Sequence, residues 1–241
     1  MIILLTGCIN PQGMAFTALS DKEKRKNQYI KAITFYLETC KHPIVFVENS
    51  GTDISSNFEE AIRQKKLECV TFEGNKNKRK GKGAGECEII EYALSHSQTI
   101  KTSKKHCICK ITGRLVVKNI NHLLFFHSMF FSSTTVFFSI NSDLSFPDSR
   151  LVIAPIPFWV SFLKSKNKVD DSEGYYFEHA LLDCLIKEKN GYSPFLITPQ
   201  IEGMSGSTGQ IYSCPNKDFK STYKYFKYTI SQRRRFYKLF R

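Results

Sequence analysis

Residues 106–117 read HCICKITGRLVV, a strand-like apolar run followed by a turn that carries two cations. Lys110 and Arg114 stand four residues apart and are separated by a Thr-Gly step, which suits a tight backbone turn at the end of a strand. Such a turn can direct backbone N–H groups and two positive side chains at a single anion. A surface turn with solvated cations is the alternative for this segment taken alone. The neighbouring strands therefore decide between a turn that binds an anion and a surface turn.

The N-terminal third of the chain alternates apolar runs with helical patterns. Residues 2–5, 44–47 and 67–72 predict buried strands, and residues 21–40 and 57–66 predict helices between them. Short, continuously apolar strands are typical of a parallel sheet with both faces covered. This order predicts a right-handed, parallel α/β half of the nucleotide-binding type, with ligands at the carboxyl ends of its strands.

A basic, glycine-rich segment follows the third predicted strand. Residues 74–86 contain five cations and four glycines and precede a helical pattern. A glycine-rich loop that enters a helix N-terminus is suited to binding phosphate. The segment lacks the GK[ST] ending of a Walker loop and the spacing of a Rossmann fingerprint. A disordered basic linker is the alternative.

Farther along the chain, apolar runs predict more strands and helices. Residues 122–126 and 129–140 are apolar and aromatic, and the second of these runs predicts either one strand with a turn or the two arms of a hairpin. The other expected elements are a strand at 151–156, a helix or aromatic loop at 157–163, a mobile polar loop at 167–174, a helix at 176–187, a last strand at 195–197 and a small-residue loop at 201–209.

The chain has a strong excess of positive charge. Its 35 Lys and Arg against 22 Asp and Glu give a formal net charge of +13. This balance predicts an acidic partner: nucleic acid, an anionic membrane surface or a phosphorylated substrate. The eight cysteines form no CxxC pair, so we expect reduced core thiols and no zinc site. The sequence contains no run of about 18 apolar residues, so we expect no membrane span.

The C-terminal segment, residues 211–241, is basic and aromatic. This mixture fits an interfacial helix on an anionic membrane. It would also fit a tail that binds nucleic acid. The aromatic side chains of this segment are also compatible with a homodimer.

Taken together, the segments resemble a small bacterial glycosyltransferase of the GT-A type, from the biosynthesis of surface polysaccharides such as O-antigen, lipopolysaccharide or capsule. The resemblance covers roughly residues 1–210 and rests on residues 6–11, 48–50, 81–86, 110–114, 141–143, 148–150 and 177–180. It implies a Rossmann-like α/β fold, a mixed and mainly parallel sheet flanked by helices. It further implies one catalytic domain, with a nucleotide-binding half at 1–105 and an acceptor half at 106–210, followed by a membrane-associating or packing segment.

The resemblance also implies a set of residues that bind a nucleotide-diphospho sugar: Thr6, Gly7, Asn10, Glu48, Asn49, Lys82, Gly83, Gly85, Glu86, Lys110, Thr112, Gly113 and Arg114. The last four stand where the family usually carries a metal-binding Asp-x-Asp motif, which this chain lacks there. Lys110 and Arg114 would then replace the metal as counter-charge of the diphosphate. Alternatively, Asp143 would supply a single metal carboxylate, so dependence on Mg²⁺ or Mn²⁺ stays open.

Glu178 matches the family's position for the base that activates the acceptor in inverting enzymes. A helix N-terminal carboxylate, favoured by the helix dipole, is the alternative for this residue. His179 would be structural or would contact the acceptor. The implied reaction is the inverting transfer of a sugar, expected to be a hexose, to a hydroxyl of a lipid-linked glycan, on the cytoplasmic face of the cell membrane.

Two other functions compete with this interpretation. A basic module that binds RNA or DNA fits the charge, but the sequence has no RNP, KH or helix-turn-helix signature. A nucleotidyltransferase would share the phosphate-binding features, but it normally needs paired carboxylates for two metals. No convincing pair is found in the sequence.

Overall fold

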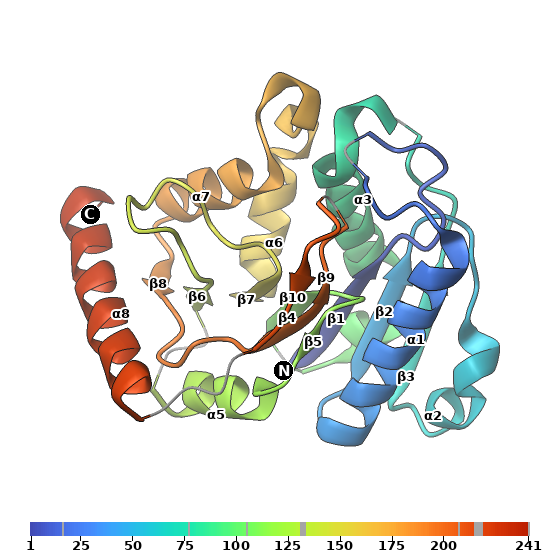
Figure 1. Ribbon diagram of the computed structural model, residues 1–241, viewed down its shortest axis with the longest axis horizontal. Coiled ribbons are helices and arrows are strands. Elements are labelled where there is room, and N and C mark those ends of the chain that lie inside the picture. Colours follow the sequence, from blue (N-terminus) through green and yellow to red (C-terminus); the bar gives the residue numbers. More distant parts are fainter. Residues whose placement is uncertain are drawn as a thin grey trace.

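A seven-stranded sheet with helices on both faces forms the centre of the molecule (Figure 1). The computed structural model describes residues 1–15, 17–76, 78–104, 106–130, 134–206, 208–214 and 219–240. The strand order is β3-β2-β1-β4-β7-β6-β8. The strands are β1 (Ile2–Gly7), β2 (Ile44–Glu48), β3 (Leu67–Thr71), β4 (Cys107–Thr112), β6 (Thr135–Phe137), β7 (Leu151–Pro155) and β8 (Gly191–Ser193).

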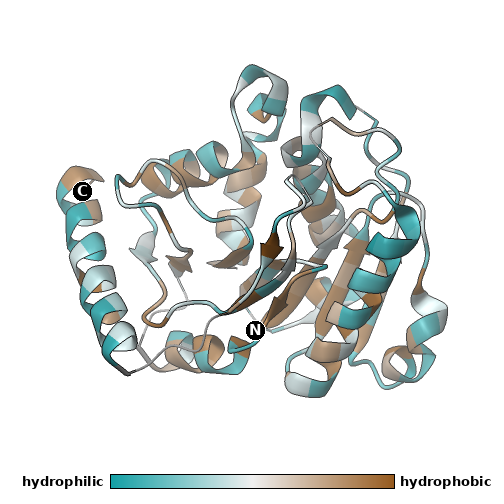
Figure 2. Ribbon diagram, in the orientation of Figure 1, coloured by the Kyte–Doolittle hydropathy of each residue, from teal (hydrophilic) through white to brown (hydrophobic). Residues whose placement is uncertain are grey.

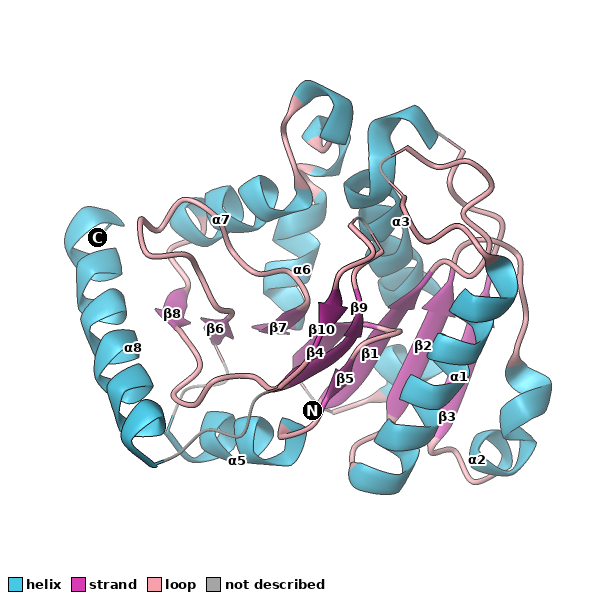
Figure 3. Cartoon of the chain, viewed as in Figure 1, coloured by secondary structure: helices cyan, strands magenta, loops and turns pink. Residues whose placement is uncertain are grey.

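The sheet is mixed and mainly parallel, as predicted. The pairs β3-β2, β2-β1, β1-β4 and β6-β8 are parallel, whereas β7 is antiparallel to both β4 and β6. A small antiparallel sheet of β5 (Val116–Val117), β9 (Ile201–Met204) and β10 (Ile211–Tyr212) lies against it, as Figure 3 shows.

The helices cover both faces of the central sheet. They are α1 (Lys22–Thr39), α2 (Glu59–Arg63), α3 (Gly81–His96), α4 (Gln98–Thr102), α5 (Ile120–Phe130), α6 (Ile156–Leu163), α7 (Phe177–Lys187) and α8 (Phe219–Phe240), with single 3₁₀ turns at Ser55–Phe58, Lys78–Lys80, Lys166–Lys168 and Asp171–Glu173. Side chains alternate along β1: Ile2 and Leu4 join one core cluster with α3, α6 and α7, and Ile3 and Leu5 join the other with α1 and α5. The central strands are correspondingly mostly apolar (Figure 2).

The chain changes direction within the sheet between β1 and β4. The connection from β1 to β2 runs through α1 on one face, and the connection from β3 to β4 runs through α3 on the other. Such a switch point leaves a crevice at the carboxyl ends of the two strands. There Gly113 N donates to Thr6 O at 2.8 Å, and a Cβ on Gly113 would lie 2.7 Å from the same oxygen. This approach requires glycine.

Helix α8 closes the far edge of the sheet. The Tyr237 hydroxyl accepts from Tyr192 N at 2.8 Å and donates to Tyr192 O at 3.1 Å, on the edge strand β8. Phe236 is fully buried, and its ring lies 4.5 Å from that of Tyr192. This part of the predicted tail therefore packs onto the domain, while residues 215–218 and Arg241 lie outside the described residues.

The aromatic residues 122–126, for which no element was predicted, lie in helix α5, and so do the first two residues of the strand or hairpin expected at 129–140. Ile120, Leu123, Leu124 and His127 follow helical spacing, and all four are buried in α5. The second part of the expected strand is reduced to β6, and its Ser132 and Ser133 lie outside the described residues.

Three further expectations are corrected. The last strand of the central sheet is β8, not residues 195–197, and it forms because it can pair with β6. Residues 201–204 form strand β9 in place of a loop, while Ser207 lies outside the described residues. Gly81, Gly83 and Gly85 lie within the first turns of α3, not in a loop before it. Among the described helices, none is long and apolar enough to cross a membrane.

Candidate active site

A cavity of about 740 Å³ opens at the carboxyl ends of the central strands. Its walls come from α3, the end of β4, the segment before β7, the start of α7 and the small sheet. A smaller cavity of about 80 Å³ adjoins it beside the ends of β1 and β2. The two cavities share Lys82, Glu86, Thr112 and Arg114, so these four residues lie at their junction.

The structure brings many of the predicted residues together here. Those that line one or both cavities are Thr6, Gly7, Asn49, Lys82, Gly83, Gly85, Glu86, Thr112, Arg114 and Glu178. Those that do not line them are Asn10, Glu48, Lys110, Gly113, Asp143 and His179.

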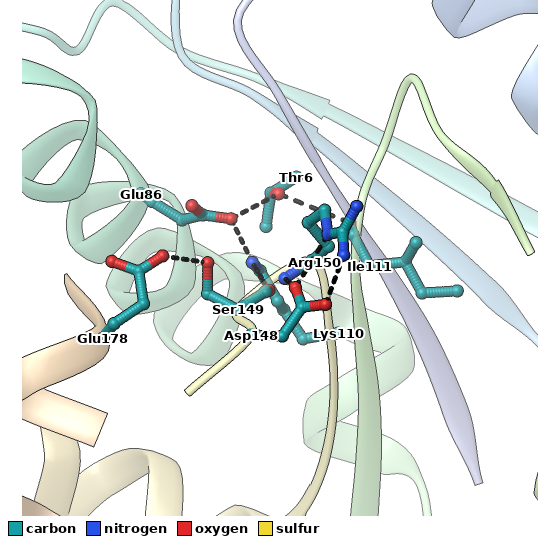
Figure 4. A network of polar contacts seen from close by, with 8 residues as sticks. All are labelled: Thr6, Glu86, Lys110, Ile111, Asp148, Ser149, Arg150 and Glu178. Carbon is teal, nitrogen blue, oxygen red and sulfur yellow. Dashed lines mark hydrogen bonds and ion pairs between the residues drawn. The ribbon is translucent and has the colours of Figure 1, made fainter. Parts of the chain in front are cut away.

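Lys110 lies beneath the cavity and is fully buried. Its Nζ donates to Ser149 O at 2.7 Å and forms an ion pair with Glu86 (Figure 4), and it lies 5.2 Å from the centre of the Phe177 ring. Glu86 also accepts from the Thr6 hydroxyl at 2.9 Å. Lys110 thus joins α3, β4 and the segment before β7, and its charge is compensated inside the protein.

Two cations line the junction of the cavities, Lys82 and Arg114. Burial lowers the pKa of Lys82 to about 8, and the nearby Arg114 charge acts in the same direction. Arg114 Nη1 donates to the Met204 carbonyl, which ties β4 to β9. Burial also lowers the pKa of Arg114, although an arginine stays protonated. Two partly desolvated cations in one cavity favour an anionic ligand with more than one charged group.

Glu178 projects into the same cavity from the first turn of α7. The Ser149 hydroxyl donates to Glu178 Oε1 at 2.5 Å, as Figure 4 shows. Burial raises the pKa of the Glu178 carboxyl, and the charge of Glu86 adds to the rise, against the hydrogen bond from Ser149. A carboxyl held in place with a raised pKa is suited to accept a proton from a hydroxyl.

Glu48 and Asn49 shape the end of β2 in different ways. Glu48 is fully buried, and its carboxylate accepts from Ile9 N at 2.8 Å and Thr52 N at 2.9 Å, so it fixes the loops after β1 and β2. Asn10 lies on the first of these loops, where its N–H donates to Ser50 Oγ at 2.9 Å. Asn49 faces the small cavity and donates to Gly85 O at 3.2 Å.

Asp143 and His179 lie away from the cavity. Asp143 is exposed, and its carboxylate accepts from Ser145 in a turn, which lowers its pKa. His179 Nδ1 accepts from Tyr176 N at 3.1 Å at the start of α7, a helix-capping role. Among the described residues there is no group of three or more His, Cys, Asp or Glu side chains that could hold a metal ion.

The N-terminal N–H groups of α3 already have an anionic partner. Gly83 N donates to Asp171 Oδ2 at 3.1 Å, from a turn that the sequence suggested was mobile. A Cβ on Gly83 would lie 2.7 Å from Asp171 Oδ1 and 2.9 Å from Val169 Cγ1. These glycines therefore allow close packing of α3, and the chain's own carboxylate occupies the position expected for a phosphate.

Four site residues were missed from sequence: Arg25, Asn75, Ser149 and Asp171. Arg25 is buried and donates through Nε to Cys8 O at 2.9 Å, which holds the loop after β1. It continues the buried stripe of α1 through Tyr29 and Ile33, and an arginine on such a stripe was the available signal. Asn75 pairs with Asn49 through their side-chain amides at 2.8 and 3.0 Å.

Comparisons with known proteins find weak similarities to solved structures and show no family. No family model and no curated protein matches the sequence. A nucleoside-diphosphate-sugar pyrophosphorylase from Vibrio cholerae is similar at 10% identity, covering 94% of this chain and 100% of its own, with a TM-score of 0.48. Core-mannan synthase A from Aspergillus fumigatus, in its Mn/GDP form, is similar at 8% identity, covering 95% and 85%, with a TM-score of 0.44. A cytidylyltransferase from Leptospira borgpetersenii is similar at 12% identity, covering 80% and 75%, with a TM-score of 0.43. The chemistry therefore depends on the side chains of the site.

Proposed function

We propose that the protein is a glycosyltransferase that moves a sugar from a nucleotide-diphospho sugar to a hydroxyl of a glycan. One observation carries the proposal: the half-buried Glu178 carboxyl, with its raised pKa, lines the same cavity as Lys82 and Arg114. A proton acceptor and two cations are what the transfer of a sugar from a diphosphate needs. The cavity also lies at the strand ends where α/β sheets bind nucleotides.

In the proposed reaction, Glu178 removes the proton of the acceptor hydroxyl as its oxygen attacks the anomeric carbon. The bond between that carbon and the diphosphate oxygen breaks, and the nucleoside diphosphate leaves with the bonding electrons. Lys82 and Arg114 stabilise the negative charge that develops on the diphosphate. Direct attack of this kind inverts the configuration at the anomeric carbon. Lys82 takes the role that the sequence had suggested for Lys110.

The carboxylates that line the cavity do not resemble a metal site. Glu86 pairs with Lys110, Asp148 pairs with Arg150, Asp171 accepts from α3, and Glu178 accepts from the Ser149 hydroxyl. The residues present thus fit a resident Mg²⁺ or Mn²⁺ poorly, and the cationic side chains take the role of counter-charge.

The remaining parts of the proposal concern the setting of the reaction. Residues 1–210 would form the catalytic domain, and the acceptor would be a lipid-linked glycan of surface-polysaccharide synthesis. Helix α8, with seven Lys and Arg and no Asp or Glu, would hold the enzyme on the anionic cytoplasmic face of a membrane. A homodimer is compatible with the exposed aromatic side chains of α8.

The test is thermal stabilisation by a panel of nucleotide sugars, with Mg²⁺, with Mn²⁺ and with a chelator, for the wild type and Arg114→Ala. We expect one nucleotide class to raise the melting temperature of the wild type and to have less effect on the variant. A rise that needs the metal would reject the cationic site. No rise with any nucleotide sugar, together with tight and salt-sensitive RNA binding, would reject the transferase and favour a nucleic-acid-binding protein.

A further inference from the structure

A second large cavity, of about 560 Å³, lies beside the main cavity on the side of α8. The two share Ser139, Ile140, Asp148, Arg150 and Tyr212, so they form one continuous depression. One wall of the second cavity is the β9–β10 hairpin with Gln210 and Tyr212. The other wall is the face of α8 that carries Tyr225, Tyr228 and Gln232. We call this second cavity the hairpin groove.

The hairpin groove differs from the main cavity in charge. Arg25, Lys82 and Arg114 line the small and main cavities. In the part of the chain that the structure describes, Arg150 is the cation that lines the hairpin groove, and it is already paired. Its Nε and Nη2 donate to the two oxygens of Asp148 at 2.8 and 2.6 Å. The groove is therefore close to electrically neutral.

The side chains of the groove suit an uncharged sugar chain. Three tyrosines and three glutamines line it: Tyr212, Tyr225, Tyr228, Gln200, Gln210 and Gln232. Tyrosine rings can stack on the C–H faces of sugars, while amides and hydroxyls can both donate to and accept from sugar hydroxyl groups. Hydrophobic side chains with a few polar groups of this kind are typical of small-molecule sites.

The walls of the groove are fixed before any ligand binds. The Gln232 amide donates to Ile140 O at 2.8 Å and to Asn141 O at 3.0 Å, which joins α8 to the segment between β6 and β7. The Arg150 guanidinium lies 4.5 Å from the centre of the Tyr212 ring, which supports the hairpin. A pre-organised groove loses less conformational entropy on binding.

We infer that the hairpin groove binds the uncharged glycan portion of the acceptor, and that the sugar that receives the transfer lies in the main cavity beside Glu178. The inference rests on the proposed glycosyl transfer for its role. Donor and acceptor then occupy opposite ends of one depression, a cationic end for the diphosphate and a neutral end for the sugar chain.

The experiment is a calorimetric titration with a panel of short neutral oligosaccharides, and with acidic oligosaccharides of equal length. The variants are Tyr228→Ala and Gln210→Ala. Tyr223→Ala is the matched control, because it lies on the same helix and is 52% exposed, compared with 42% for Tyr228, but does not line the groove. We expect neutral oligosaccharides to bind the wild type, and loss of the Tyr228 ring to weaken binding about tenfold. The control should bind as the wild type does.

Thermal stabilisation of the same proteins by nucleotide sugars tests the donor site separately. Stabilisation in every protein, with no oligosaccharide binding, would overturn the groove assignment alone. Binding that is unchanged in both groove variants, or that favours acidic chains, would also overturn it. Oligosaccharide binding that depends on Tyr228, without stabilisation by any nucleotide sugar, would keep the groove and reject the proposed donor chemistry.

Discussion

Glu178 and Lys82 line one cavity, and burial shifts both pKa values toward neutrality, the carboxyl upward and the ammonium downward. Each shift follows from the cost of keeping a charge away from water. In the proposed reaction the two groups have opposite requirements: the carboxyl must be ionised to take a proton, and the ammonium must be protonated to hold a phosphate. Replacing Glu178 should therefore affect the transfer step, and replacing Lys82 should affect the binding of the donor.

Replacing Glu178 by Gln should remove transfer while donor binding remains. The amide keeps the size of the side chain but cannot take a proton, and loss of a general base typically lowers the rate by about 10²–10⁴-fold. The measurement is the turnover of the nucleotide sugar that stabilises the wild type, together with its stabilisation of the variant. Glu173→Gln, on an exposed turn outside the cavity, is the control. Wild-type turnover in Glu178→Gln would reject this base.

The pH dependence of donor binding should report Lys82. With a pKa lowered to about 8, Lys82 loses its charge as the pH rises through about 8, so affinity for the diphosphate should fall there. Lys82→Arg should keep its affinity at higher pH, because arginine stays protonated. Titration of the nucleotide sugar across this range checks the prediction. An identical decline in both proteins would assign the pH effect to another group.

Helix α3 begins beside Asp171, and removal of this contact should lower the free energy of unfolding by a measurable amount. Asp171→Ala leaves Gly83 N without its acceptor and should lower stability by about 1 kcal/mol, within the range found for helix caps. Asp171→Asn keeps an acceptor oxygen and should retain most of the stability. Urea unfolding of the three proteins provides the comparison. Equal loss in both variants would indicate that the negative charge, and not the hydrogen bond, matters.

Helix α8 should be required for stability as well as for any surface role. Phe236→Ala removes a fully buried ring from its contact with Tyr192 and should cost about 3–5 kcal/mol. Leu239→Ala, at a side chain that is 62% exposed on the same helix, should change stability by no more than about 0.5 kcal/mol. Denaturant titration separates the two. A small effect of Phe236→Ala would mean that α8 is only loosely attached.

Elements with a local signal were predictable, and those that depend on distant pairing were not. The strands near residues 2, 44 and 67 and helix α1 are confirmed, because their apolar patterns lie within one segment. Helix α5 was not predicted, because its aromatic residues favour strands although its buried side chains keep helical spacing. Strand β8 has three residues and exists through its partner β6, which no local pattern reveals.

The same distinction applies to the site. Thr6, Lys82, Arg114 and Glu178 lie at strand or helix ends, where sequence patterns indicate ligand contacts, and they line the cavities. Asp171 was missed because it meets Gly83 from 88 residues away. Lys110 was predicted to bind the diphosphate, because its ion pair with Glu86 cannot be seen in the sequence.

At the scale of the molecule, the net charge of +13 predicts attraction to anionic surfaces, and α8 concentrates seven cations on one helix. The protein should bind vesicles that contain anionic phospholipid and dissociate as salt is added, since these charges are screened. Lys220, Lys224 and Lys227 changed together to Gln should weaken binding by about 1 kcal/mol per lysine. Sedimentation with vesicles gives the affinities.

The matched control carries the same charge change on α1, with Lys22, Lys24 and Lys31 changed to Gln. If both triple variants lose equal affinity, binding follows net charge and α8 has no special role. If neither loses affinity, the proposed attachment of the protein to a membrane through α8 is rejected.

The Tyr237 hydroxyl satisfies both backbone groups of Tyr192 on the outer edge of the sheet. During synthesis on the ribosome, β8 emerges before α8, so that edge stays open until α8 has left the exit tunnel. An open strand edge can pair with a neighbouring nascent chain. Chains that stall in this interval should need a chaperone, and truncation before α8 should give inclusion bodies in place of a smaller folded enzyme.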